Sequence, residues 1–352
     1  MRSIRTGTFV LMMALLMTFS ISAQEEGLNI VATTSIIADV AQNVAGDLAT
    51  VTSLIPAETD EHTFVPAPND IITLAEADVL LMNGANLEEG LLEIIEENAS
   101  VEPTIVSLGV EILGGDHNHE EAEHSAEEAE ATEEADHEHG AYEVVGVLGE
   151  DGVCEDAHDE EGEAEHDHEH GACDPHVWTD PANVILWVNN IAAALSAADP
   201  ANADIYAANA EAYIAELEAL AEELDSLVAQ VPDDQRVIVT NHEFLAYFAH
   251  RYGFEVVGTV IPGVTTSAEV APQDILALIE TVEAEGVRVI FAETSATTDL
   301  AETIASEIGY EVAIVTLYSG ALSRSDGPAA TYLDYMRHNT TAIVNALLGT
   351  SD

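Results

Sequence analysis

Short apolar segments alternate with longer segments of helical periodicity along this chain, and the alternation occurs in both halves. Strands are expected at residues 29–34, 51–55, 79–82 and 104–108, and again at 237–240, 254–260, 287–292 and 311–315. Strands that alternate with helices form parallel sheets with helices on both faces. The expected fold is therefore α/β, with two lobes that each hold a four-stranded, mainly parallel sheet flanked by helices.

A long stretch without strand signals, residues 199–231, separates the two halves. Its apolar residues recur at helical spacing from Tyr206 to Leu227. A helix of about 30 residues extends roughly 45 Å, which is enough to run the length of a two-lobed protein. We expect a first lobe at 28–198, a linking helix at 199–231 and a second lobe at 232–350.

The N-terminus has the pattern of a secretory signal peptide over residues 1–23. Arg2 and Arg5 precede an apolar run at 9–19, and small residues follow at 20–23. No cysteine lies near the expected cleavage site, so no lipid anchor is expected there. No other stretch is long and apolar enough to predict a membrane span. We therefore expect an exported protein that is periplasmic or extracellular.

The charge of the chain excludes several classes of partner. The formal net charge is -60, from 67 acidic and 7 basic residues, and lysine is absent. Nucleic acids and anionic lipids bind through cationic side chains, so neither is an expected partner. Such a surface attracts cations, although an acidic surface alone does not prove metal binding.

Acidic residues and histidines are concentrated in residues 114–172, which we interpret as an insertion in the first lobe. Nine of the 14 histidines lie there among Asp, Glu and Ala. A solvated acidic linker is the alternative, but the density of imidazoles favours contact with metal ions. Within this tract, residues 142–148 are mostly apolar and predict a strand or one arm of a hairpin.

The chain contains two cysteines, Cys154 and Cys173. In an oxidising compartment, a pair that closes a loop of about 20 residues favours a disulfide. Free thiols and metal ligation remain the alternatives.

Three histidines outside the acidic tract lie in loops. His62 follows the second expected strand, and His242 follows the first strand of the second half. His176 lies between two Asp-Pro pairs, where proline stiffens the backbone on both sides. Three neutral imidazoles in one cleft form a good zinc environment with water or a carboxylate in the fourth position. The spacing does not establish that they meet, and a buried loop histidine that caps a helix remains the alternative for His176.

Several motifs around these histidines occur in a fixed order. They are Glu61-His62-Thr63-Phe64 with Pro66 and Pro68, Asp174-Pro175-His176-Val177-Trp178-Thr179-Asp180-Pro181, Thr240-Asn241-His242-Glu243, Phe291-Ala292-Glu293-Thr294, and Leu317-Tyr318-Ser319-Gly320-Ala321-Leu322. With them, the chain resembles the zinc- and manganese-specific solute-binding proteins of bacterial ABC importers, over essentially all of the mature chain except the insertion. The resemblance implies two α/β lobes joined by a rigid helix, with one metal ion between them.

The same resemblance implies that His62, His176 and His242 are metal ligands. The family often has a fourth, acidic ligand in the motif near the last strand, where this chain has Gly320. Substitutes for it are Glu61, Asp299, a histidine of the insertion, or water. Glu293 matches a family glutamate that we interpret as structural, orienting a ligand from outside the metal's own shell.

A donor set of three imidazoles favours zinc over manganese, which prefers more oxygen ligands. The sequence therefore predicts an extracytoplasmic zinc-binding protein that acts as a monomer and delivers Zn²⁺ to an ABC permease. Because histidine must be neutral to bind, we expect capture to weaken as the pH falls through about 6.5. The alternatives are a manganese or iron importer component, a surface metal buffer or adhesin, and a zinc hydrolase. The last is disfavoured because no HExxH or GxSxG motif is present.

Overall fold

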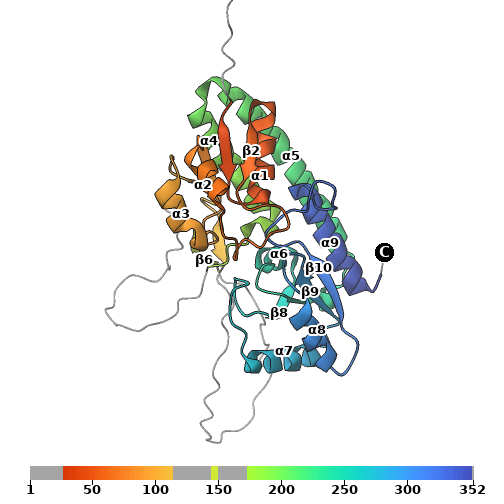
Figure 1. Cartoon of the computed structure of the whole chain (residues 1–352). Helices are drawn as coiled ribbons and strands as arrows, with labels where there is room; N and C mark the ends of the chain where they lie inside the picture. The colour runs from red at the N-terminus through yellow and green to blue at the C-terminus, as the bar shows by residue number, and fades with distance from the viewer. Residues whose placement is uncertain (1–26, 114–143, 150–172, 351–352) are drawn as a thin grey trace, which may run out of the picture.

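The computed structural model describes residues 27–113, 144–149 and 173–350. The expected signal peptide, Cys154 and all nine histidines of the acidic tract lie outside the described residues, so those predictions stay predictions. The described chain forms two α/β lobes, one above the other in Figure 1.

The first lobe is built on a four-stranded parallel sheet of order β2-β1-β3-β4. Its strands are β1 (Asn29–Ala32), β2 (Thr50–Ser53), β3 (Val79–Met82) and β4 (Thr104–Ile105). Its helices are α1 (Ser35–Ala45), α2 (Pro68–Ala75), α3 (Leu92–Asn98) and α4 (Pro181–Ala198). Thr34 begins α1 by accepting a hydrogen bond from the N–H of Ile37, so the chain turns into a helix directly after the central strand.

The second lobe repeats this plan, with a four-stranded parallel sheet of order β10-β9-β7-β8. The strands are β7 (Val237–Thr240), β8 (Glu255–Thr259), β9 (Val289–Glu293) and β10 (Ala313–Leu317). The helices are α6 (Ala246–Tyr252), α7 (Pro272–Glu285), α8 (Asp299–Glu307) and α9 (Tyr332–Leu348). Two parallel four-stranded sheets with flanking helices confirm the expected fold class.

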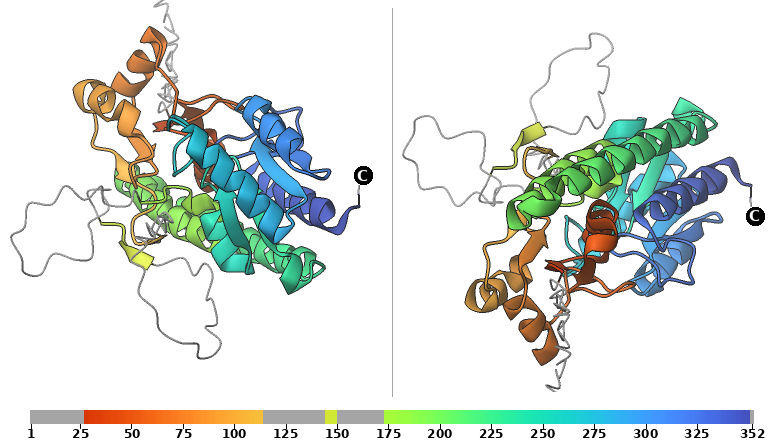
Figure 2. Two further views of the ribbon diagram at one scale, coloured as in Figure 1. Left: turned by 90° about the horizontal axis from the view of Figure 1, so that it is seen from below. Right: turned by 90° about the horizontal axis from the view of Figure 1, so that it is seen from above.

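The long helix α5 (Ala203–Val228) runs alongside both lobes (Figures 1 and 2). It packs on α1 and α4 of the first lobe and on α9 of the second. A single apolar cluster includes Val40 of α1, Leu217 of α5 and Ile343 of α9. Because this core continues from one lobe to the other, burial of apolar surface opposes wide separation of the lobes.

Several features differ from the sequence-based expectations. The strand expected at 104–108 is shortened to Thr104–Ile105, and the strand expected at 311–315 lies at Ala313–Leu317. Between the third and fourth expected strands, the chain forms a 3-10 turn at Glu89–Leu91 and becomes α-helical only in α3. A small antiparallel pair also forms between β5 (Glu111–Leu113), which was not expected, and β6 (Val144–Val147). The strand predicted within 142–148 is therefore confirmed as one arm of this pair.

Helix α4 is long and apolar enough to cross a bilayer, and it is the one helix of the described chain that meets this test. A core helix of a soluble fold meets the same test. Here α4 packs on α5 and α1, with Val184, Trp187 and Ile191 among its fully buried residues.

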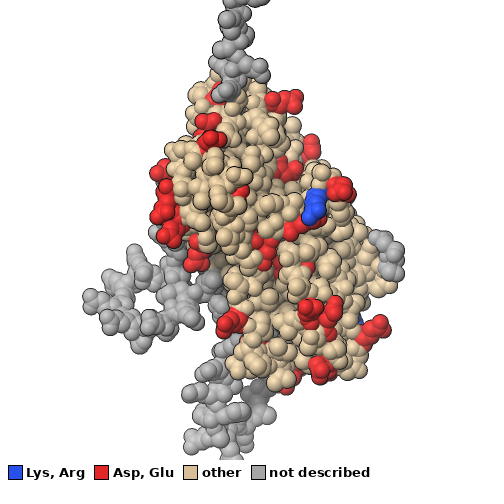
Figure 3. Space-filling view, in the orientation of Figure 1, with Lys and Arg blue, Asp and Glu red and all other residues tan. Residues whose placement is uncertain are grey.

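Acidic side chains are spread over the face of both lobes seen in Figure 3, with few basic ones between them. The charge therefore belongs to the folded lobes as well as to the acidic tract.

Candidate metal centre

His62 lies in the loop that leaves the carboxyl end of β2. Such loops commonly bind ligands in parallel α/β sheets. The backbone N–H of His62 donates to Oδ1 of Asp60 at 2.9 Å, which closes a local turn. His62 is the most exposed of the three loop histidines, with its side chain 7% accessible.

His176 is held by Asp174 from two directions. Oδ1 of Asp174 accepts a hydrogen bond from the backbone N–H of His176 at 2.9 Å and lies 2.7 Å from its Nδ1. The preceding carbonyl, Pro175 O, accepts from the side-chain amide of Asn83 at 3.0 Å. The ring of His176 packs edge-on against Trp178. The Asp-Pro-His segment is thus fixed by buried polar contacts as well as by proline.

His242 follows β7 and is oriented by Glu293 at the end of β9. Nδ1 of His242 lies 2.6 Å from Oε1 of Glu293. The same carboxylate accepts from Asn241 Nδ2 at 2.7 Å and from Ser319 Oγ at 2.6 Å. Because both oxygens of the Glu293 carboxylate accept hydrogen bonds, the carboxylate is fixed in place and orients the ring of His242.

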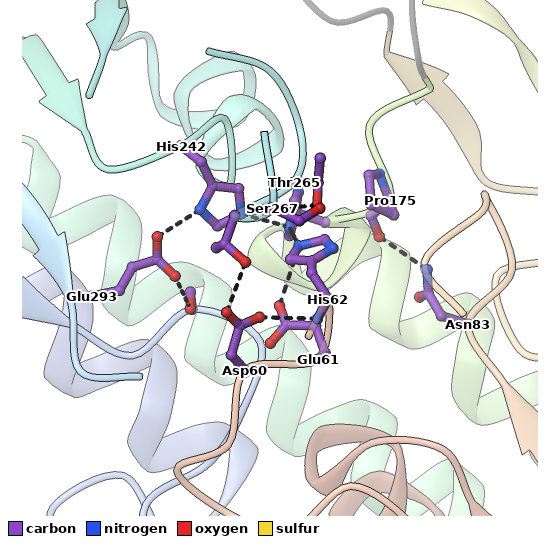
Figure 4. Close-up of polar contacts among 12 residues, drawn as sticks. Asp60, Glu61, His62, Asn83, Pro175, His242, Thr265, Ser267 and Glu293 are labelled. Carbon is purple, nitrogen blue, oxygen red and sulfur yellow. Dashed lines mark hydrogen bonds and ion pairs between the residues drawn. The ribbon is translucent and has the colours of Figure 1, made fainter. Parts of the chain in front are cut away.

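The three imidazoles converge between the lobes. Figure 4 shows two of them, His62 and His242, turned toward the same point. Nε2 of His176 lies 3.3 Å from Nε2 of His62 and 3.1 Å from Nε2 of His242. One ligand nitrogen from each ring lies within 4.8 Å of the other two, and no other such cluster was found among the described residues. Histidines more than 60 residues apart in sequence thus face a common point.

The surroundings shift the pKa values of these rings in different directions. Burial, with the neighbouring histidines, lowers the pKa of His62 to about 3 and that of His176 well below its usual range. Burial also acts to lower the pKa of His242, but the Glu293 carboxylate outweighs it and the pKa is raised. Although burial acts to raise the pKa of Glu293, its interaction with His242 lowers it to about 2. Two rings are therefore neutral at pH 7, and the third is paired with an anion.

Glu61 places a carboxylate oxygen near one of the three rings, that of His62. Its Oε1 lies 3.8 Å from Nε2 of His62, is buried, and accepts no hydrogen bond from any described residue. Burial raises the pKa of Glu61 to about 8. A Cβ on Gly320 would overlap the Glu61 carboxylate, so the glycine leaves the space that this carboxylate fills. An unpaired buried acceptor of this kind indicates a missing cation or proton.

The remaining sequence candidates lie elsewhere. Asp299 begins α8 and is exposed, outside the histidine cluster. The two other histidines outside the acidic tract, His250 and His338, lie within α6 and α9. Cys173 is buried at the point where the described chain resumes, but the disulfide stays a prediction because Cys154 lies outside the described residues.

Two contributing residues were missed in the sequence. From the sequence alone, Asp174 is placed in a stiff loop, but its bond to His176 is not predicted. Asp60, which bonds the backbone of His62, is assigned no role there. The same Asp-x-His spacing precedes His62 and His176, and in each the Asp accepts from the N–H two residues later. This local turn is the signal that could have identified both.

Fold and site together define a class: a two-lobed solute-binding protein with a candidate metal centre between its lobes. A family model described as zinc-uptake complex component A, periplasmic, matches residues 30–346. The chain belongs to this family, as its motifs led us to expect.

Curated relatives and solved structures agree with this assignment. The manganese-binding lipoprotein MntA of Halalkalibacterium halodurans is 29% identical over 97% of both chains. The iron-binding protein YfeA of Yersinia pestis is 26% identical over 89% of this chain and 84% of the relative. A manganese-bound periplasmic metal-binding protein from Candidatus Liberibacter asiaticus, solved as an S38A mutant, has a TM-score of 0.70 at 26% identity. That likeness covers 90% of this chain and 98% of the neighbour.

Family membership confirms the coarser predictions. The protein is the extracytoplasmic metal-binding component of an ABC importer, and its partners are metal ions and a permease. The family consists of transport proteins and not of enzymes, so the hydrolase alternative and the free-standing metal buffer are set aside.

Proposed function

We propose that this protein captures Zn²⁺ through His62, His176 and His242 and delivers it to its permease. The observation that carries the proposal is the convergence of three Nε2 atoms, with neighbouring pairs 3.1 and 3.3 Å apart. Tetrahedral zinc with Zn–N distances of about 2.0–2.1 Å separates its ligand nitrogens by about 3.3–3.4 Å. The spacing of the imidazoles is therefore close to that of a zinc site.

The tautomers also support a cation at this point. When Nδ1 of His176 donates to Asp174 and Nδ1 of His242 donates to Glu293, both Nε2 atoms present lone pairs. Two lone pairs 3.1 Å apart repel each other unless a proton or a metal ion lies between them. A divalent cation satisfies both rings and His62 at once.

Glu61 is the fourth ligand in this proposal. Its carboxylate is buried with Oε1 3.8 Å from Nε2 of His62, and this oxygen accepts no hydrogen bond from the described chain. Gly320, where relatives often carry the acidic ligand, provides the space for it. The chain thus keeps one carboxylate at the site but supplies it from the first lobe.

Three imidazoles with one carboxylate favour zinc over manganese or iron, because manganese prefers a larger share of oxygen ligands. The competing proposal is manganese or iron, since relatives are named for binding these metals. Zinc is favoured because Asp174 and Glu293 already face the Nδ1 atoms of His176 and His242. Glu61, with Oε1 3.8 Å from Nε2 of His62, is the carboxylate left to supply an oxygen to the ion.

We further propose that the protein acts as a monomer with a first lobe at 28–198, a linking helix at 199–231 and a second lobe at 232–350. The continuous core through α1, α5 and α9 supports small lobe movements during release. Cleavage after residue 23 belongs to the same proposal, and mass spectrometry of the exported protein tests it.

The metal and its ligands are tested together. Metal analysis of the purified protein and competitive titration with zinc and manganese are expected to give one tight site that prefers zinc. Replacing any one of the three histidines by alanine is expected to weaken zinc binding by at least about 100-fold. Mutating residues that only hydrogen-bond to metal ligands already lowers metal affinity by about 10- to 100-fold. His338→Ala is the matched control, because that ring lies in α9 against Tyr318. A preference for manganese, or triple replacement without effect, would contradict the proposal.

A further inference from the structure

Residues 57–62, here called the strap, connect the end of β2 to His62 and cross onto the second lobe. The N–H of Glu58 donates to the carbonyl of Leu322 at 3.0 Å, and the Glu58 carboxylate lies 2.8 Å from Nε of Arg324. Glu58 adopts a left-handed conformation with φ 60°, which few non-glycine residues occupy. One end of the strap is therefore fastened to the loop after β10.

The other end of the strap is fastened through Asp60. Oδ1 of Asp60 accepts from the N–H of His62 at 2.9 Å, and Oδ2 accepts from Oγ1 of Thr266 at 2.7 Å. Thr266 belongs to the loop between β8 and α7, in the second lobe. One carboxylate thus joins the backbone of a site histidine to the opposite lobe, beside the imidazoles in Figure 4.

The two Asp-x-His turns use their carboxylates differently. Asp174 directs its oxygen to both the backbone and Nδ1 of His176, so it holds the ring within one lobe. Asp60 holds only the backbone of His62 and uses its second oxygen for Thr266. Among the three histidines, His62 is the one whose ring has no carboxylate at Nδ1 in the described chain.

We propose that the Thr266–Asp60 hydrogen bond positions His62 over the site and controls how fast the metal ion leaves. His176 and His242 are fully buried and held by carboxylates, whereas His62 is held through the strap. When this bond opens, the Asp60 end of the strap and His62 move away from the second lobe, while Glu58 stays fastened and the other two imidazoles stay in place. Asp60 and Thr266 are positioning residues, because they act through His62 and do not face the ion.

The inference rests on the proposed function and is tested by release kinetics with zinc alone as the probe. Thr266→Val removes the hydroxyl at nearly constant volume, and Thr266→Ser keeps it. Zinc release into excess chelator is expected to be about tenfold faster for Thr266→Val. The reason is that losing a hydrogen bond to a charged group changes an equilibrium or rate constant by about tenfold or more. The serine variant is expected to release zinc at the wild-type rate.

Thr265→Val is the matched control, because Thr265 bonds Ser267 and not the strap. Thermal unfolding of the metal-free variants separates this role from a general loss of stability, and similar melting temperatures are expected. Equal release rates for wild type and Thr266→Val, or equal acceleration by Thr265→Val, would overturn the inference. If wild type retains manganese and not zinc, the proposed metal fails, and the same comparison of rates with manganese still decides the role of Thr266.

Discussion

The carboxylate of Glu61 fills the space that a side chain at Gly320 would need. Glu61 belongs to the first lobe and Gly320 to the loop after β10 in the second, so the two positions are complementary across the site. A carboxylate can come from one position or the other but not from both without rearrangement. This relationship explains how the chain retains an acidic oxygen at the centre although the position near the last strand has no side chain.

Gly320→Ala is expected to weaken zinc binding by about 10- to 100-fold, because the new Cβ displaces the Glu61 carboxylate. Glu61→Gln should weaken it to a similar extent, and the double variant should be little worse than either single one. Competitive zinc titration measures all three. Gly90→Ala is the control, since a Cβ there meets nothing within 4 Å. If the losses of zinc affinity in the two single variants add up in the double variant, Gly320→Ala does not act by displacing the Glu61 carboxylate.

Asp174→Asn and Glu293→Gln are each expected to weaken zinc binding by about 10- to 100-fold. Each change removes a carboxylate that lies 2.7 or 2.6 Å from the Nδ1 of a site histidine, which lowers the basicity of that ring and frees its orientation. Asp299→Asn, an exposed change at the start of α8, should leave the affinity unchanged. Calorimetric titration gives the affinities, and a loss in Asp299→Asn would instead restore that residue as a candidate ligand.

Zinc affinity is expected to fall as the pH is lowered from about 8. His62 and His176 stay neutral over this range, since burial lowers their pKa values. Glu61, with its pKa raised by burial to about 8, and His242, with its pKa raised mainly by Glu293, take up protons that zinc must displace. The pH range over which zinc affinity falls therefore lies above the value of about 6.5 that unperturbed histidines would give.

Proton release provides the measurement for this pH dependence. Titration calorimetry at pH 7 in buffers of different ionisation enthalpy counts the protons released on zinc binding. Glu61→Gln should lower that count by about one, because the amide has no acidic proton to lose. Zinc binding without proton release at pH 7, in wild type, would contradict the assignment of Glu61.

Removing the acidic tract should leave the tightest zinc site intact. All three histidines and Glu61 lie in the described lobes, whereas nine histidines lie in the tract. The deletion must spare β6 and Leu148, which pair with β5 and pack into the core. Replacing residues 116–142 and 151–171 by short Gly/Ser linkers does this. Zinc titration should then retain one tight site and lose weaker ones; loss of the tight site would contradict the proposal.

The sequence by itself determined the fold class and the approximate limits of most elements. Strands β3 and β7 match the expected segments to the residue, because short apolar runs bounded by polar turns have few other ways to be buried. The motifs around His62, His176 and His242 identified the family, since their order and spacing are specific. The 3-10 turn before α3 and the pairing of β5 were not evident, because both depend on contacts that local propensity does not contain.

Only the tertiary structure decided which groups meet. Gly320 and Glu61 are more than 250 residues apart, as the numbering shows, and no local pattern relates them. The same is true of Asp60 with Thr266, which meet where loops of the two lobes touch, and of His242 with Glu293, which meet where the paired strands β7 and β9 end. Periodicity along the chain decides which residues are buried, but the packing of the two lobes decides which buried groups become neighbours.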